Sequence, residues 1–177
     1  MRSKLLVLAI FTVSCALCAQ AQREIPARAV ERIKREVRHE MLMLPYYNVL
    51  DNITFAVSGY DVTLMGQVTN PTLKRDAENV VKRIEGVEKV TNQIEVLPVS
   101  SMDDGLRLRL YRAIYGFPSM EKYAMPVIKP IRIIVKNGQV TLEGVVDSEG
   151  DKNIAGVRAN SVSGVFSVTN NLAVAKP

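Results

Sequence analysis

The chain has 177 residues, and 47% of them are hydrophobic, enough for a packed core, which excludes a globally disordered protein. It has 23 basic and 18 acidic residues, and the resulting net charge of +5 is weak for a nucleic-acid-binding protein. One histidine and two cysteines exclude most zinc sites, which need about four nitrogen or sulfur ligands, and exclude a framework of several disulfides.

The first residues have the pattern of a secretory signal peptide. Two basic residues and a short apolar run precede Ala19-Gln20-Ala21, a small-residue cleavage pattern. The run is shorter than a bilayer-spanning segment, which takes roughly 20 apolar residues. We therefore expect residues 1–21 to be removed on export, which places the mature protein in the periplasm or outside the cell. An uncleaved anchor and a lipoprotein modified at Cys15 or Cys18 are the alternatives.

Two blocks of the remaining sequence occur twice at a fixed spacing of 78 residues. The block VTLMGQV at 62–68 matches VTLEGVV at 140–146, and GVEKVTN at 86–92 matches GVFSVTN at 164–170. No gap is needed between the two blocks. Repetition at one ungapped spacing indicates a duplicated module.

The repeat divides the chain into two domains, which we expect at residues 27–98 and 104–175. A short segment with proline and serine, residues 97–101, joins them. The adjacent Asp103 and Asp104 are expected to cap the first helix of the second domain. Modules of about 70 residues have marginal cores, so we expect the two copies to support each other.

The first copy begins with the pattern of a helix followed by a hairpin. Apolar residues at helical spacing over 30–37 predict an amphipathic helix. Apolar residues alternate with polar or small ones over 53–57 and 62–66, which predicts two strands with a turn at 58–60. The second copy has Asn137-Gly138 at this turn, a strong signal for a type I′ hairpin.

A second helix and a last strand complete each copy. Asn70 suits the cap of a helix and Pro71 its first position, and the apolar stripe that follows reaches Ile84. Gly86 suits the left-handed residue after a helix, and residues 87–96 predict the last strand. Because strand–helix–strand crossovers are right-handed, the strands that this helix joins should be parallel. The predicted fold class is α+β: two tandem α-β-β-α-β modules, each a three-stranded mixed sheet with two helices on one face.

The second helix of the second copy looks weaker than its counterpart. Gly150 and Gly156 each cost about 1 kcal/mol relative to alanine in a helix. Asp151 stands where the first copy has the apolar Leu73. We expect this helix to be shorter or looser.

The repeated blocks resemble the BON family, the bacterial OsmY and nodulation domain. The resemblance rests on Val-Thr-Leu-x-Gly-x-Val at 62–68 and 140–146 and on Gly-Val-x-x-Val-Thr-Asn at 86–92 and 164–170. It implies a tandem protein similar to the periplasmic dual-BON proteins, which support envelope integrity under osmotic stress. It also implies a binding module, with phospholipid as the usual ligand and periplasmic chaperone activity as the alternative. The glycines of these blocks are expected to serve the fold: Gly66, Gly86, Gly144 and Gly164.

The first helix of the second copy is the predicted contact with lipid. Residues 99–177 have ten basic and seven acidic residues, net +3, whereas residues 28–98 have ten of each. Cations near an anionic membrane gain about 1 kcal/mol each, and tyrosine and phenylalanine rings suit its interface. With the resemblance, this predicts peripheral binding to anionic phospholipid. The predicted contact residues are Arg107, Arg109, Tyr111, Arg112, Tyr115 and Phe117.

Two alternatives to this lipid site stay open. At the spacing of 78, Leu108, Tyr111 and Tyr115 correspond to core positions of the first copy, so they could face the core instead. The methionine-rich apolar run at 41–47 could bind varied protein partners, as a chaperone or scaffold does. Envelope proteins would then be the partners.

The residues that carry catalysis elsewhere form no constellation in this sequence. His39 stands between Arg38 and Glu40 on a charged helix face, which favours an exposed residue over a general base. No glycine-rich phosphate-binding loop occurs. We expect no enzymatic activity, no cofactor, no metal and no nucleic-acid partner.

Overall fold

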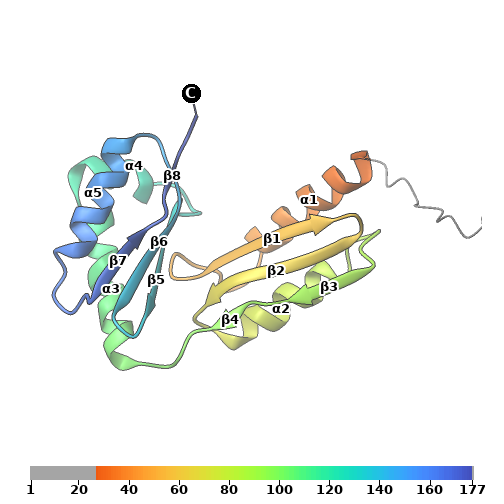
Figure 1. Cartoon of the computed structure of the whole chain (residues 1–177), viewed down its shortest axis with the longest axis horizontal. Helices are drawn as coiled ribbons and strands as arrows, with labels where there is room; N and C mark the ends of the chain where they lie inside the picture. Colours follow the sequence, from red (N-terminus) through yellow and green to blue (C-terminus); the bar gives the residue numbers. More distant parts are fainter. Residues whose placement is uncertain (1–26, 177) are drawn as a thin grey trace, which may run out of the picture.

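The computed structural model describes residues 27–176 (Figure 1). These residues form two successive modules with the same order of helices and strands, so the predicted α+β class and the duplication are confirmed. The predicted signal peptide at 1–21, with Cys15 and Cys18, lies outside the described residues. Its cleavage and its possible lipidation stay predictions.

The first module follows the predicted order of elements. β1 runs antiparallel to β2, and β3 and β4 both run parallel to β2 on its other side. β3 and β4 therefore act as one interrupted strand, and the sheet order is β1-β2-β3 with β1 at an edge. The elements are α1 (Ala27–Leu42), β1 (Asn52–Ser58), β2 (Asp61–Val68), α2 (Pro71–Val81), β3 (Lys89–Asn92) and β4 (Glu95–Val96).

The second module repeats this topology and adds a short helical segment between its first helix and its sheet. β5 is antiparallel to β6, and β7 and β8 are parallel to β6. The added segment consists of a 3-10 turn, η1, and the single-turn helix α4. The elements are α3 (Ser101–Tyr115), η1 (Pro118–Met120), α4 (Glu121–Ala124), β5 (Ile131–Lys136), β6 (Gln139–Val146), α5 (Glu149–Asn160), β7 (Ser167–Asn170) and β8 (Ala173–Val174).

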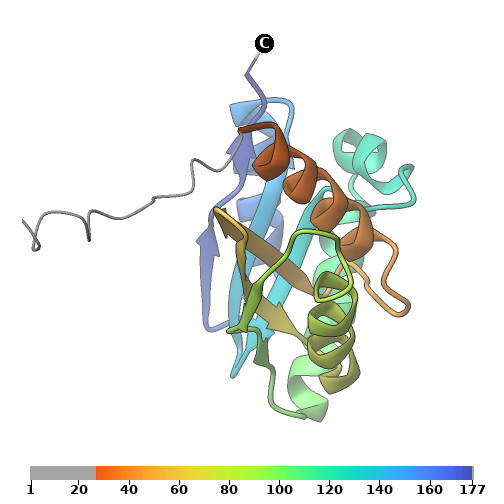
Figure 2. The ribbon, with the colours of Figure 1, turned by 90° about the vertical axis from the view of Figure 1, so that its right-hand side faces the viewer.

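In each module two helices cover one face of the sheet. Figures 1 and 2 show α1 and α2 on one face of the first sheet, and α3 and α5 on one face of the second. Asn70 caps α2 by accepting a hydrogen bond from the backbone of Thr72, and Pro71 occupies its first turn, as predicted. The core of the first module consists of buried side chains from both helices and the sheet, among them Ile33, Val37, Leu64, Leu73, Ala77 and Val81.

Two glycines hold the hairpins close to the preceding chain. Gly66 has φ +114°, and a Cβ placed on it would lie 2.0 Å from the carbonyl oxygen of Asn52. Gly144 has φ +123°, and its Cβ would lie 1.9 Å from the oxygen of Pro130. No side chain fits at such distances. These glycines therefore serve the fold by letting two backbone segments approach each other.

The cap of α3 differs from the prediction. Ser100, and not Asp103 or Asp104, is the cap: its side chain accepts a hydrogen bond from the Asp103 backbone at 3.2 Å. α3 therefore begins at Ser101, three residues before the expected domain boundary. Asp103 is buried and accepts hydrogen bonds from the backbone of Asn137 and Gly138, so it stabilises the β5–β6 turn instead.

The first helices of the two modules correspond at a spacing of 77 residues, not 78. Arg32 donates to the carbonyl of Glu85 at 3.0 Å, and Arg109 donates to the carbonyl of Ser163 at 3.4 Å. The two carbonyls are 78 positions apart but the two arginines are 77 apart. The alternative that these residues face the core is therefore wrong for Leu108, which is 50% exposed, whereas Tyr111 packs against the core and Tyr115 is buried in it. The residues of α3 that are buried in the core are Leu106, Leu110, Ile114 and Tyr115.

The prediction that α5 is shorter than its counterpart α2 was also wrong. α5 has 12 residues and α2 has 11. Ser148 caps α5, and the carboxylate of Asp151 accepts hydrogen bonds from Lys122 at 3.0 Å and Tyr123 at 2.9 Å. Both partners come from α4, which the first module lacks. The charge that replaced Leu73 is thus compensated by the added segment.

Candidate functional site

The exposed face of α3 carries apolar and basic side chains next to one another. Met102 is 82% exposed and Leu108 is 50% exposed, and both are solvent-facing although they are apolar. Arg109 and Arg112 are exposed on the same helix. Residues three, four or seven positions apart lie on the same side of a helix, so these four residues lie along one side of α3.

Phe166 extends this face beyond the helix. Its side chain is 81% exposed, and its backbone N–H donates to the carbonyl of Gly138 at 2.8 Å, which fixes its position beside the β5–β6 turn. Phe166, Met102 and Arg109 line one open hollow of about 540 Å³. We call Met102, Leu108, Arg109, Arg112 and Phe166 together the α3 surface.

Sequence reasoning did not include Phe166 in the site, although the repeat contained the signal. The residue 78 positions earlier is Glu88, which is exposed at the corresponding turn of the first module. An aromatic side chain has thus replaced a charged one at a solvent-facing position. Such a replacement has no role in the core of the module.

Arg107 is buried and cannot contact a membrane in this structure. Only 3% of the residue is exposed. Its guanidinium donates to the carbonyl of Val135 at 2.7 Å and pairs with Asp104. The side chain therefore provides a hydrogen-bond donor for a backbone carbonyl at the edge of β5. Arg107 is thus not one of the residues that can contact lipid.

Tyr115 is buried as well, at 4% exposure. Its hydroxyl donates to the carbonyl of Ile131 at 2.5 Å and accepts from the N–H of the same residue at 3.2 Å. Burial raises the pKa of Tyr115. The hydroxyl holds the backbone of Ile131, the first residue of β5. Tyr115 is therefore not available for the predicted contact with lipid either.

The two remaining aromatic residues of the prediction are half-buried. Tyr111 packs against the core of the second module, and its ring centroid lies 5.0 Å from that of Tyr115. Phe117 lies below the guanidinium of Arg158 at 4.8 Å. Of the six predicted lipid contacts, only Arg109 and Arg112 are exposed in the structure.

The basic residue Lys122 of α4 forms ion pairs within the second module. Lys122 forms ion pairs with Asp147 at 2.8 Å and with Asp151 at 3.0 Å. The hydrogen bonds to the two carboxylates raise the pKa of Lys122, and its ammonium lowers the pKa of Asp147 and Asp151. This cluster joins α4 to the start of α5.

The methionine-rich run at 41–47 is divided between core and surface. Met41 and Leu44 are buried in the first core, whereas Met43 and Tyr46 are exposed. The run ends at the junction between the modules, where Leu42 and Tyr47 line a hollow of about 400 Å³ together with residues of the second module. The exposed members form a second apolar surface, distinct from the α3 surface.

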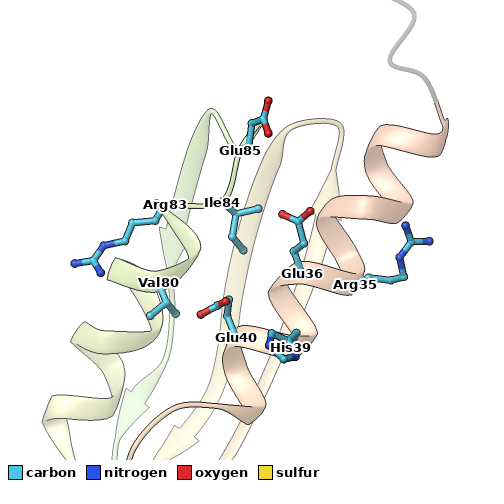
Figure 3. Close-up of a pocket in the computed structure, with 8 residues that line it drawn as sticks. All are labelled: Arg35, Glu36, His39, Glu40, Val80, Arg83, Ile84 and Glu85. Carbon is cyan, nitrogen blue, oxygen red and sulfur yellow. The ribbon is translucent and has the colours of Figure 1, made fainter.

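A third hollow, of about 550 Å³, lies between α1 and the end of α2 and includes His39 (Figure 3). Figure 3 shows that Arg35 and Arg83 extend away from it on either side. His39 is exposed, as predicted from its charged neighbours. Among residues 27–176, no group of three or more histidine, cysteine, aspartate or glutamate side chains is placed to hold a metal ion.

None of the helices within 27–176 combines the length and the apolar character that crossing a bilayer requires.

Comparisons with known proteins relate the chain to a family. No curated protein matches it. Among solved structures it is similar to CdsD, a structural protein of the type III secretion system of Chlamydia trachomatis, with 14% identity over 82% of this chain and 94% of that chain and a TM-score of 0.29. The C-terminal domain of CdsD gives 11% identity over 80% of this chain and 96% of that chain, also with a TM-score of 0.29. These two likenesses are too weak to assign a function.

The family model of the BON domain is the informative match. It matches residues 29–98 and residues 122–176, one segment in each module. The two segments cover more than half of the chain and contain the repeated Val-Thr-Leu-x-Gly-x-Val and Gly-Val-x-x-Val-Thr-Asn blocks. The chain belongs to the BON domain family, with one domain in each of its modules.

Proposed function

We propose that this protein is exported to the cell envelope, binds the surface of anionic phospholipid membranes peripherally and supports envelope integrity. It acts as a binding protein and not as an enzyme. Membership of the BON family supports this proposal, because the family suggests a membrane- or phospholipid-binding envelope protein. The signal-peptide pattern of residues 1–21 supports the location.

The observation that carries the proposal is the exposed Phe166 beside Arg109 in one hollow. Moving the exposed part of a phenylalanine such as Phe166 into an apolar environment gains up to about 1.5–3 kcal/mol. Each exposed arginine adds about 1 kcal/mol near an anionic surface. Phe166, Arg109 and Arg112 together therefore provide a binding energy suited to a weak and reversible peripheral contact.

The first module lacks this combination at the corresponding turn. Glu88 stands in place of Phe166, and residues 28–98 have no net charge. A glutamate would be repelled by anionic headgroups and has no apolar body to insert. The contact is therefore proposed for the second module.

The test is co-flotation of residues 22–177 with liposomes. We expect binding to anionic vesicles and not to zwitterionic ones, and loss of binding at high salt, because salt screens exposed charges over about 8–10 Å. Phe166→Glu should abolish the binding, and the double variant Arg109→Ala/Arg112→Ala should weaken it at least about tenfold. Binding that ignores lipid charge, or that both variants retain, would contradict the proposal.

A charge-matched control is available in the same module. Val145→Glu introduces the same carboxylate at a half-exposed position of β6, on the face of the sheet opposite α3. The corresponding residue of the first module is the polar Gln67, so the substitution suits the strand. We expect Val145→Glu to bind anionic vesicles as the unaltered chain does.

A second candidate function is binding of envelope proteins by a chaperone or scaffold. The observation that favours it is the exposure of Met43 and Tyr46, which leaves part of the 41–47 run on the surface. Apolar contacts should persist at high salt, unlike the arginine-dependent lipid contact. Suppression of a client protein's aggregation, lost in Met43→Ser/Tyr46→Ser but kept in Phe166→Glu, would support this function.

A further inference from the structure

The two modules are joined by a segment of the first that lies along the sheet edge of the second. Residues 48–50, between α1 and β1, reach β5 (Figure 1), which is the edge strand of its sheet. The N–H of Ile133 donates to the carbonyl of Val49 at 2.9 Å. The guanidinium of Arg132 donates to the carbonyl of Asn48 at 2.8 Å. The segment therefore adds backbone hydrogen bonds to an edge strand, a mode of recognition known as β-augmentation.

Side chains complete this contact between the modules. Val49 and Leu50 pack against the core of the second module. Arg132 also lies over the ring of Tyr47 at 4.5 Å, and Lys136 pairs with Glu95 at 2.5 Å. The apolar pair and the backbone hydrogen bond form the centre of the contact, and the charged groups lie around it.

The shape of the inserted segment is set within the first module. Asp51 is fully buried, and its carboxylate accepts hydrogen bonds from the N–H and the hydroxyl of Thr69 at 2.7 and 2.8 Å. It also accepts from the N–H of Asn48 at 3.2 Å. The segment is thus held in its turn by its own module, so a neighbouring edge strand meets a preformed surface.

The duplication supplies a second edge of the same kind. The residue that corresponds to Ile133 at the spacing of 78 is Phe55 in β1, also an edge strand. In the β1–β2 register, Ser58 pairs with Asp61 across the turn, so the N–H of Phe55 points away from β2 as that of Ile133 points away from β6. Within residues 27–176, no loop or helix donates to or accepts from the backbone of Phe55.

An open groove runs along this edge. It has a volume of about 580 Å³ and lies between β1 and the side of α1 that carries Lys34, Arg38 and Leu42. At the spacing of 77 for the first helices, Lys34 corresponds to Tyr111, which lines the hollow that contains Val49. The groove beside β1 in the first module is therefore the counterpart of the hollow beside β5 in which Val49 lies.

The second module has a segment at the position that corresponds to the inserted one, although Lys129 stands where the first module has Asp51. Val127 and Ile128 precede β5 as Val49 and Leu50 precede β1, at the spacing of 78. Val127 is 98% exposed, and Ile128 is exposed as well. Both residues line the open hollow of about 400 Å³ beside Val49 at the junction of the modules, and Val127 buries almost none of its surface there.

We propose that the chain associates head to tail, with the Val127–Ile128 segment of one copy added to the β1 edge of the next. Each junction repeats the contact that Val49 and Leu50 make with β5 inside one chain. The two surfaces are different, so the contact is not self-complementary and can propagate into a ring or an open filament.

This contact between copies is weaker than the one inside the chain. The counterparts of Arg132 and Lys136 are Thr54 and Ser58, so the charged contacts are absent. The short linker also keeps the two modules of one chain close together, at an effective concentration in the millimolar range. We therefore expect association that is reversible and visible at protein concentrations of about 0.1–1 mM.

The first test is sedimentation velocity of residues 22–177 over a concentration series. The average mass should rise with concentration, and Val127→Asp should lower the association constant at least about tenfold, since a carboxylate would have to be buried at the junction. Circular dichroism should show that this variant stays folded, because Val127 is outside the core. A chain that stays monomeric to 1 mM, or an association that Val127→Asp leaves unchanged, would overturn the proposal.

The second test establishes which surfaces meet. After removal of residues 1–21 the chain has no cysteine, so Thr54→Cys and Val127→Cys can be introduced separately. Mixing the two variants should give the mixed disulfide faster than either gives its own homodimer, and faster than Thr54→Cys reacts with the control Val99→Cys. Preferential Val127→Cys homodimers would show a symmetric contact and overturn the proposal. Phe166→Glu should leave association unchanged, which separates this proposal from lipid binding.

Discussion

At the scale of single residues, exposure decides the role of each arginine of α3. Arg107 and Arg109 are two positions apart, so they point to different sides of the helix. Arg107 is buried and hydrogen-bonded to the carbonyl of Val135, whereas Arg109 is exposed beside Phe166. The first therefore belongs to the stability of the module, and the second to its proposed contact with lipid.

This division predicts opposite effects for two matched substitutions. Arg107→Met keeps the length of the side chain but leaves the Val135 carbonyl without its donor, which should cost about 1–3 kcal/mol of unfolding free energy. Arg109→Met should change that free energy by less than about 0.5 kcal/mol. Urea denaturation measures both values. Equal effects of the two substitutions would contradict the assignment of Arg107 to the interior.

Burial of this kind could not be predicted from the sequence. Arg107, Arg109 and Arg112 read alike as a solvated helix face, and the register of α3 against the first module differs by one residue from the spacing of the repeated blocks. The first helices share too little sequence to reveal that difference. Phe166, in contrast, was open to prediction, because the repeat places an aromatic residue opposite the exposed Glu88.

At the scale of elements, the hairpins are the part of the fold that the sequence predicts best. The strand pattern, the Asn137-Gly138 turn and the glycines at 66 and 144 all recur in both copies, because they satisfy backbone constraints that any such module shares. α5 was predicted worst. Its buried Asp151 is compensated by Lys122 and Tyr123, and no local pattern links residues that are 29 and 28 positions apart.

Two glycine substitutions contrast the roles of glycine in these elements. Gly144→Ala should cost at least about 3 kcal/mol and can prevent folding of the module, because its Cβ would overlap the Pro130 oxygen. Gly150→Ala, in the exposed first turn of α5, should raise stability by about 0.5–1 kcal/mol, since the nearest atom is the Ser148 hydroxyl at 3.5 Å. The melting temperatures of the two variants, measured by thermal unfolding, test both expectations. A stable Gly144→Ala protein would contradict the close approach of these two backbone segments.

The Asp151 cluster makes the stability of the second module depend on pH. The hydrogen bond from Lys122 lowers the pKa of Asp151 in the folded state below its ordinary value of 3.8. Stability from this group is therefore complete above the unfolded pKa and is lost as the pH falls through the folded pKa. We expect the melting temperature of Asp151→Asn to be lower than that of the unaltered chain at pH 6, and the difference to shrink below pH 4. A difference that stays constant or grows on acidification would contradict this account.

At the scale of the whole molecule, the duplication has produced two modules with different surfaces. The first has no net charge and an open sheet edge beside α1. The second has a net charge of +3, the α3 surface and a sheet edge filled by residues 48–50 of the first. One fold thus supports both the joining of the modules and the proposed binding of a membrane, by changes at exposed positions.

The most direct measurement is co-flotation of residues 22–177 with anionic liposomes, comparing Phe166→Glu with Val145→Glu. Both variants add one carboxylate to the second module, but only the first places it on the α3 surface. The account predicts that Phe166→Glu no longer floats with the vesicles, while Val145→Glu floats as the unaltered chain does. Equal flotation of both variants would show that the α3 surface is not the membrane contact and would contradict the central claim.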